Sequence, residues 1–287
     1  MPECAQKSAR TPAFFIFWSQ SFYTVGSFFI SRKEEIYDHP KENGGSPMPN
    51  HVMNVLTLRG EPEQLLQLME SVKYDRLGTG SVDFNKIIPM PETLDIEAGS
   101  RTDRGLKFYR AFVEVYTLGG TCNMDRLAMI PKESEEIFLR QRADIPVDEW
   151  ELGKTAWNNL QRYGAPTWYE WCTQHWGTKW NSYGYDEGAR GDADRGLRFQ
   201  TAWSAPHPVL QKLTEQFPNV EITHRWADED LGRNCGQRIY YGGSCLEAYY
   251  PEAYAEGLSF AAELWEIDPE EAFAEDNQDV TDGGMEY

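Results

Sequence analysis

Cysteine is scarce and scattered in this sequence of 287 residues. The five cysteines are Cys4, Cys122, Cys172, Cys235 and Cys245, and no two of them form a CxxC pair. Secreted disulfide frameworks use an even set of cysteines in a short chain, so this odd and scattered set argues against that class of protein. The simplest interpretation is a protein of the reducing cytoplasm.

Positive charge is also sparse. The formal net charge is −19, and residues 251–287 contribute −12 of it because they hold twelve Asp and Glu residues and no Lys or Arg. Proteins that bind nucleic acid non-specifically usually present a basic face, so the overall charge disfavours them but still allows a local basic groove. The charge favours a protein whose acidic surface meets a basic partner in place of DNA.

Long apolar runs are missing as well. Residues 13–30 (AFFIFWSQSFYTVGSFFI) come nearest, but Ser, Gln and Thr interrupt a span that would need about 20 mostly apolar residues to cross a membrane. A clear signal-peptide cleavage site is lacking too. A third interpretation is that translation starts at Met48, which leaves residues 1–47 as a non-native or disordered extension. We expect no membrane association.

Motifs of catalysis are not found. Lys179 follows Gly177-Thr178, but the phosphate-loop pattern GxxxxGK[ST] is absent and this glycine stands at a predicted helix end. Ser204 and Ser244 lack the context of a nucleophile elbow. The sequence therefore predicts no catalytic residue and no cofactor.

Aromatic residues, in contrast, are concentrated in one stretch. Residues 168–203 hold five of the ten tryptophans. Each large ring buries roughly 150–250 Å², so we expect this stretch to form the core of a small α+β domain. Phe199 and Trp203 alternate with Arg198 and Gln200, which predicts that both rings point into the core.

The N-terminal part predicts a β-α-β unit over residues 48–95. Alternating apolar residues from His51 indicate a strand, and Pro62 precedes a helix over Glu63–Lys73. A second strand is predicted over Ser81–Ile88, where Pro89 ends it. A helical insertion follows over residues 96–163, with helical spacing in Leu106–Leu118 and from Asp148 to Tyr163. Residues 121–147 are ambiguous.

Residues 164–250 predict a ferredoxin-like core. A short helix covers Trp168–Trp176 and another covers Val209–Phe217. Strands are predicted over Lys179–Tyr185, 197–203, Val220–Trp226 and Gln237–Tyr241. With the N-terminal unit, this order predicts an α+β ferredoxin-like sandwich, in which helices pack on one face of an antiparallel-rich sheet. The acidic tail, residues 251–287, begins with a predicted helix over Glu252–Glu266 that docks on the body, and we expect disorder after Asp268.

Two groups of residues have spacings that metal sites use. Cys172 and His175 lie three apart on a helix, and zinc would require Cys235 and Cys245 to join them. Acidic turns suit a divalent cation, and two are present: Asp228, Glu229 and Asp230 in one, and Asp186, Glu187, Asp192 and Asp194 in the other. Core packing and solvent exposure explain these residues better, so we predict no metal.

Four segments resemble the YubB-like proteins of phages, plasmids and integrative elements. They are MPNHVMNVLTLRG (48–60), WYEWCTQHWGTKWN (168–181), FQTAWSAPHPVL (199–210) and DEDLGRNCGQRIYYGG (228–243). The resemblance spans residues 48–243. It implies a ferredoxin-like fold and an accessory role in a mobile genetic element, and it implies no catalytic residues.

Three functions stay open at this point. The leading hypothesis is a non-enzymatic cytoplasmic protein that acts on an unknown host protein through an acidic surface. The first alternative is a nucleic-acid-binding module that uses Arg198, Arg225, Arg233 and Arg238, although the predicted open sheet face lacks rings on which bases could stack. The second is an enzyme with a site near Lys179 and Asp228–Asp230. The candidate interaction residues are Lys179, Arg198, Arg225, Asp228, Glu229 and Asp230.

Overall fold

The structure is a computed structural model that describes residues 50–117, 129–185 and 196–268. All of them belong to one compact unit, Gly44–Tyr287. The predictions for residues 1–47, for the acidic segment 186–195 and for the chain after Asp268 lie outside the described residues. Within the described ranges, no helix has the length and apolar character needed to span a membrane.

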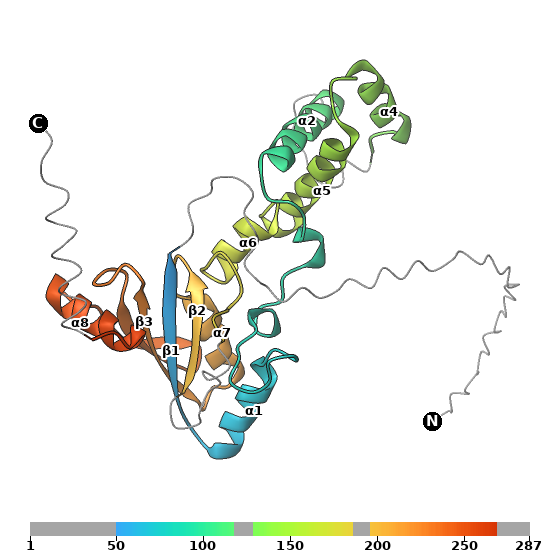
Figure 1. Cartoon of the computed structure of the whole chain (residues 1–287). Coiled ribbons are helices and arrows are strands. Elements are labelled where there is room, and N and C mark those ends of the chain that lie inside the picture. The colour runs from blue at the N-terminus through green and yellow to red at the C-terminus, as the bar shows by residue number, and fades with distance from the viewer. Residues whose placement is uncertain (1–49, 118–128, 186–195, 269–287) are drawn as a thin grey trace, which may run out of the picture. The chain divides into compact units, whose positions relative to one another are not determined.

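A five-stranded antiparallel sheet is the centre of the fold (Figure 1). The strands are β1 (His51–Arg59), β2 (Leu197–Ala202), β3 (Glu221–Asp228), β4 (Gly236–Tyr241) and β5 (Ser244–Tyr249). Their order in the sheet is β2-β1-β3-β4-β5. β1 therefore lies between β2 and β3 and joins the N-terminal part of the chain to the C-terminal half.

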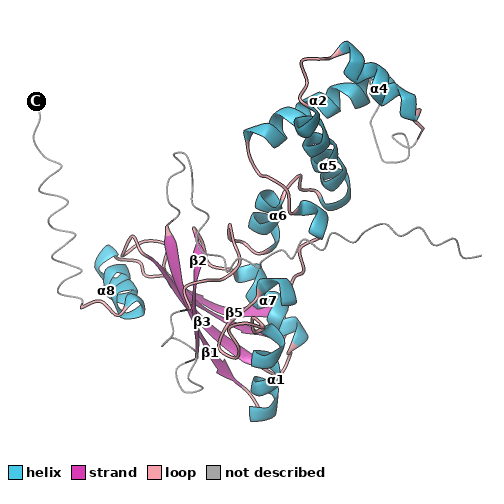
Figure 2. Ribbon diagram, turned by 45° about the vertical axis from the view of Figure 1, so that its right-hand side comes forward, coloured by secondary structure: helices cyan, strands magenta, loops and turns pink. Residues whose placement is uncertain are grey.

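Helices cover both faces of this sheet (Figure 2). α1 (Pro62–Val72), α6 (Trp168–His175) and α7 (His207–Gln216) contribute to the core on one side, which we call the inner face. α8 (Tyr254–Trp265) packs on the other side, the outer face, against Met53 and Ala227. The α+β fold with an antiparallel sheet is as predicted, and α8 is the helix predicted to dock from the tail.

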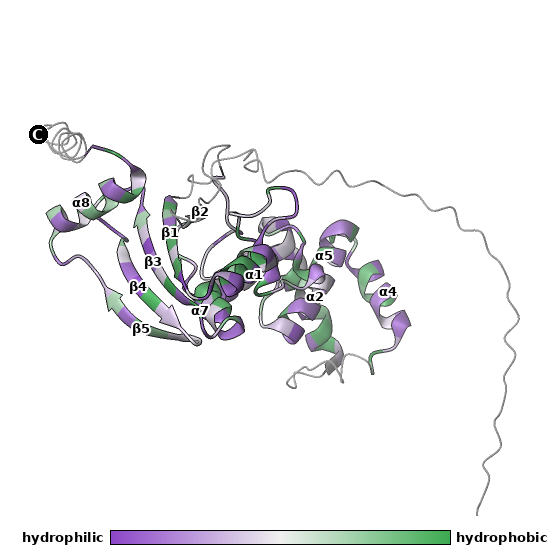
Figure 3. Cartoon of the chain, turned by 90° about the horizontal axis from the view of Figure 1, so that it is seen from below, coloured by the Kyte–Doolittle hydropathy of each residue, from purple (hydrophilic) through white to green (hydrophobic). Residues whose placement is uncertain are grey.

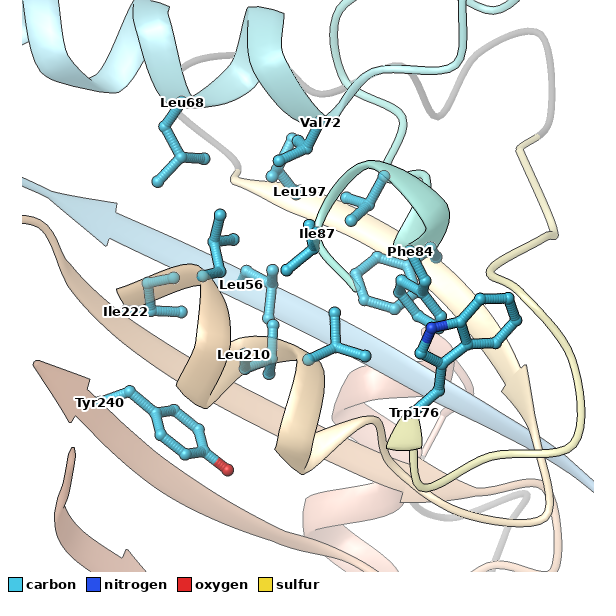
Figure 4. Packing of buried hydrophobic residues seen from close by; sticks show 14 of the residues in the cluster. Leu56, Leu68, Val72, Phe84, Ile87, Trp176, Leu197, Leu210, Ile222 and Tyr240 are labelled. Carbon is cyan, nitrogen blue, oxygen red and sulfur yellow. The ribbon is translucent and has the colours of Figure 1, made fainter. Parts of the chain in front are cut away.

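The main core lies on the inner face (Figure 4). Leu56 and Ile222 from the sheet meet Leu68 from α1 and Leu210 from α7. The alternation of strand residues explains this, because every second side chain of β1 and β3 points to the same face. Removing such side chains from water is the main force that holds α1 and α7 on the sheet.

The predicted strand over Ser81–Ile88 is wrong, so the N-terminal part is not a β-α-β unit. The segment forms a 3₁₀-helix, η1 (Phe84–Lys86), whose preceding residue Asp83 accepts a hydrogen bond from the Asn85 backbone N–H at 3.0 Å. Phe84 is fully buried, edge-on to Trp176 at 5.8 Å. A short turn buries Phe84 as a strand would, and the sequence pattern alone does not separate the two.

The predicted strand over Lys179–Tyr185 is also wrong. Tyr183 bridges to Gln200 of β2 with backbone hydrogen bonds of 3.0 and 2.7 Å, and the Lys179 N–H donates to the Ala202 carbonyl at 3.5 Å. Side chains replace the rest of the ladder: Asn181 donates to Asp83 at 2.7 Å, and Ser182 donates to the Val82 carbonyl. Asn and Ser compete with regular structure by bonding to nearby groups in this way.

The hairpin of β4 and β5 was missed, because the sequence analysis ended the sheet at Gly242-Gly243. Both glycines have positive φ, 54° and 79°. Two consecutive positive values are what a two-residue hairpin turn of type I′ requires, and glycine adopts them without strain. The Gly-Gly pair was the available signal for a further strand.

Three helices lie in the predicted insertion: α2 (Ser100–Thr117), α4 (Lys132–Gln141) and α5 (Val147–Tyr163). They share a separate aromatic cluster that includes Tyr109, Phe112, Trp150 and Trp157. α2 starts earlier than predicted, and residues 118–128 lie outside the described part. α2 and α5 approach closely at Gly105 and Gly153, where an added Cβ would lie about 2 Å from the opposite backbone.

Candidate functional site

The six predicted interaction residues lie in two places. Arg198 and Arg225 point from the outer face toward α8. Lys179, Asp228, Glu229 and Asp230 lie at the end of the sheet where β1 begins and where β2 and β3 end. The two groups have different surroundings and are described in turn.

Arg198 and Arg225 hold α8 on the sheet. Arg225 donates two hydrogen bonds to Glu263, at 2.8 and 2.7 Å, and lies over the Phe260 ring at 4.5 Å. This pairing lowers the pKa of the Glu263 carboxyl. Arg198 donates to the Leu264 carbonyl at 2.5 Å and pairs with Glu266 at 3.2 Å. The face predicted to be open is therefore covered at these arginines, and both charges already have acidic partners.

Asp228 is buried and closes the turn after β3. Its Oδ1 accepts hydrogen bonds from Asn50 Nδ2 at 3.1 Å and from the Asp230 backbone N–H at 2.9 Å, and its Oδ2 accepts one from Asn234 Nδ2 at 3.0 Å. The Glu229 carboxylate accepts a hydrogen bond from the His51 N–H at 2.9 Å and so contacts the first residue of β1. Amide donors thus use the Asp228 oxygens that a cation would need. Within the described ranges, no three potential ligands converge.

Lys179 lies between two indole rings. Its ammonium is 4.6 Å from the centroid of Trp180 and 4.7 Å from that of Trp203. The residue is only 9% exposed, and none of the described carboxylates pairs with it. Cation–π attraction to two electron-rich faces therefore offsets part of the cost of burying this charge.

Contrary to the sequence prediction, the Trp203 ring does not point into the core. β2 ends at Ala202, and Trp203 follows with φ of 73° and 37% exposure instead of pointing into the core. Its N–H donates to the Asn50 carbonyl at 2.9 Å, and its carbonyl accepts from Asn234 Nδ2 at 3.1 Å. A left-handed backbone costs a residue of this kind roughly 1–2 kcal/mol. The two hydrogen bonds keep Trp203 in that conformation.

Together, six residues form a feature that we call the Trp203 corner. They are Lys179, Trp180, Trp203, Asp228, Glu229 and Asn234. The Trp203 indole is partly exposed, and Glu229 and the neighbouring Asp230 are exposed as well. Strained backbone is often retained at functional sites, which makes this corner the candidate interaction site.

A buried polar network on the inner face was not predicted. His224 bonds through Nε2 to Asn54 Oδ1 at 3.0 Å, and Asn54 donates to Thr201 Oγ1 at 2.9 Å. His207 bonds to the Tyr240 hydroxyl at 2.8 Å, and its ring lies 5.5 Å from that of His224. His224 lies two residues after the core residue Ile222 on β3 and so shares its face, but nothing in the sequence paired these residues.

Burial dominates the titration of this network. It lowers the pKa of His207 to about 4, with a further contribution from the Arg238 charge. It lowers the pKa of His224 as well, assisted by His207 and Arg238. Both imidazoles are therefore neutral near pH 7. His224 Nδ1 is buried and has no hydrogen-bond partner among the described residues.

The cysteines considered for zinc lie apart. Cys172 belongs to the inner core, where burial raises the pKa of its thiol to about 12. Cys235 belongs to the outer core under α8, and Cys245 is exposed on β5. His175 stacks on Trp171 at 4.4 Å. These positions suit packing roles.

Comparison with known proteins identifies the sheet domain. Residues 175–268 match the family model described as the ferredoxin-like domain in Api92-like protein. A crystal structure of a protein api92 from Yersinia pseudotuberculosis is similar at 12% identity, over 71% of this chain and 99% of that one, with a TM-score of 0.34. No protein with a curated description matches. The chain thus contains the ferredoxin-like domain found in Api92-like proteins, which here takes in β2 to β5 and α8 and is completed by β1.

Proposed function

We propose that this chain is a non-enzymatic interaction protein, of the accessory kind that mobile genetic elements carry. In this proposal it works in the cytoplasm and binds a host protein through the acidic surface beside the Trp203 corner. The observation that carries the proposal is Trp203 itself, a bulky residue at φ 73° with 37% of its surface exposed. A ring kept in a strained, accessible position is poorly explained by packing alone.

The chemistry of the corner suits a protein partner. Tryptophan and tyrosine are enriched among the residues that dominate binding energy at protein interfaces, and Tyr169 packs edge-on against Trp203 at 5.9 Å. Glu229 and Asp230 follow Asp228 in the chain and are exposed, so a partner with an apolar side chain and a basic rim would fit. A net charge of −19 would accelerate the approach of such a partner.

Two arginines of the nucleic-acid alternative already have acidic partners within the fold. Arg198 and Arg225 are paired with Glu266 and Glu263. Arg238, another arginine of that hypothesis, donates to the Tyr250 hydroxyl at 2.5 and 3.0 Å. A phosphate backbone would have to displace these partners.

The test is affinity capture of host proteins by the full chain, followed by measurement of the dissociation constant with the purified partner. Trp203→Ala should weaken binding at least tenfold, which corresponds to about 1.4 kcal/mol. Leu66→Ala is the matched control, because Leu66 is a large exposed residue on α1, away from the corner. The double change Glu229→Gln and Asp230→Asn should weaken binding and reduce its dependence on salt.

Two results would overturn the proposal. One is a partner that Trp203→Ala retains as well as the parent chain does. The other is a gel shift with DNA or RNA at low ionic strength in the absence of any captured protein, which would favour the nucleic-acid alternative.

A further inference from the structure

β5 is the edge strand at the end of the sheet opposite β2 (Figure 3). All six of its residues, Ser244–Tyr249, are exposed. It pairs with β4 on one side, and none of the described strands pairs with it on the other. An edge strand of this kind has backbone N–H and C=O groups available to an added strand.

Exposed apolar side chains are frequent on this strand and close to it in the sequence. Among the described residues, eleven large hydrophobic side chains are exposed, and five of them fall between positions 241 and 254. They are Tyr241, Leu246, Tyr249, Tyr250 and Tyr254. Such clustering on a surface marks interaction sites more often than scattered single residues do.

The charge around β5 has one sign. From Ile239 to Asp268 the sequence contains six Asp and Glu residues and no Lys or Arg. Glu247 and Tyr249 lie two apart on β5 and so share the outer face, where Tyr249 donates to Glu256 at 2.5 Å. Glu247 forms no ion pair with any described residue. An incoming strand with basic side chains on that face would place cations beside Glu247 and over the Tyr249 ring.

We propose that β5 is a docking edge for an extended, basic segment of a partner protein, which adds to the sheet as a sixth strand. Main-chain hydrogen bonds would supply affinity, and lysine or arginine at alternate positions would supply specificity. A second copy of this chain fits less well, because each copy carries a charge of −19 and would bring its own acidic edge.

The test uses the full chain and a fluorescent peptide of alternating lysine and valine, about as long as β5. Fluorescence anisotropy should show binding of this peptide and at least tenfold weaker binding of a peptide with glutamate in place of lysine. Hydrogen exchange should show that the lysine peptide protects backbone amides within residues 244–249. Glu247→Lys should weaken binding at least tenfold, whereas the control Glu151→Lys, the same charge change on α5, should leave it unchanged.

Several outcomes overturn the inference. They are equal binding of both peptides, no binding of either, protection in the free chain of those amides of residues 244–249 that point away from β4, and a doubled mass in solution, which would assign the edge to a second copy. Trp203→Ala should leave peptide binding unchanged, so a failure at β5 and a failure at the Trp203 corner are distinguishable.

Discussion

At the scale of single residues, Trp203 shows how backbone conformation and exposure are linked. Its φ of 73° turns the chain away from the line of β2, so the ring leaves the core-facing position that alternation predicts. Glycine tolerates this φ, whereas alanine does not. Trp203→Gly should therefore be more stable than Trp203→Ala by about 1 kcal/mol in urea unfolding.

Leu66 is the control position, because there the alanine variant should be more stable than the glycine variant. It is exposed within α1, where alanine is favoured over glycine by about 1 kcal/mol. Leu66→Ala should thus be more stable than Leu66→Gly. If both positions favour alanine, the backbone at Trp203 is not left-handed.

The buried histidines make stability depend on pH. The folded pKa of His207 is about 4, while the unfolded value is near 6.5, so the unfolded chain binds more protons between these limits. The free energy of unfolding is therefore unaffected by this histidine above pH 6.5. It falls as the pH drops from 6.5 toward 4, by up to about 1.4 kcal/mol per pH unit for each such histidine. His224 contributes in the same direction.

The free energy of unfolding at several pH values measures this effect. His207→Gln should reduce the dependence of the unfolding free energy on pH between 6.5 and 4, because glutamine does not titrate. Equal slopes for the variant and the parent chain would show that His207 is not held neutral.

At the scale of elements, the pair of α2 and α5 depends on two glycines. An alanine at position 153 would place its Cβ 2.0 Å from the Gly105 backbone, so the helices would have to separate. Crowding of this kind costs about 1–3 kcal/mol and outweighs the higher helix propensity of alanine, which is worth about 1 kcal/mol. Gly153→Ala should lower the melting temperature and change the near-ultraviolet signal of Trp150 and Trp157.

Gly99 is the matched control for this substitution. A Cβ there would meet only a Glu97 side-chain oxygen at 3.9 Å, which is ordinary contact. Gly99 is the residue that precedes α2, where alanine is less favourable than glycine, so Gly99→Ala should lower the melting temperature slightly and by less than Gly153→Ala does. A stable Gly153→Ala variant with unchanged tryptophan signals would contradict the close approach of the two helices.

At the scale of the whole molecule, the acidic tail has two parts with different roles in stability. α8 buries Leu258, Ala261 and Leu264 and carries the partners of Arg198 and Arg225. Truncation after Tyr250 removes all of these, and each buried leucine alone is worth about 1.5–3 kcal/mol. Truncation after Asp268 keeps them and removes seven further acidic residues with no Lys or Arg.

Thermal unfolding of the two truncated chains compares these parts. The chain that ends at Tyr250 should melt well below the chain that ends at Asp268. The shorter deletion is therefore the one to use in asking whether the remaining acidic residues affect partner binding. Similar melting temperatures for both would mean that α8 is not part of the core.

The sequence by itself determined the elements whose pattern is regular and local. β1, β3, α7 and the tail helix were predicted, because apolar residues repeat there with the period of a strand or a helix. The same reasoning failed at Ser81–Ile88 and Lys179–Tyr185, where a few apolar residues fit a turn as well as a strand. Side chains from distant segments, such as Asn181 and Asp83, decided those two cases.

The candidate sites depended still more on the tertiary structure. Lys179 and Asp228 were named from the sequence, but Lys179 meets the Trp203 ring directly and Asp228 is linked to Trp203 through Asn50 and Asn234. No local pattern identifies these contacts. The arginines of the outer face looked available until α8 supplied their carboxylates. Periodicity determines which way a side chain points, whereas the folding of distant segments onto one another determines what it meets there, and binding depends on the second.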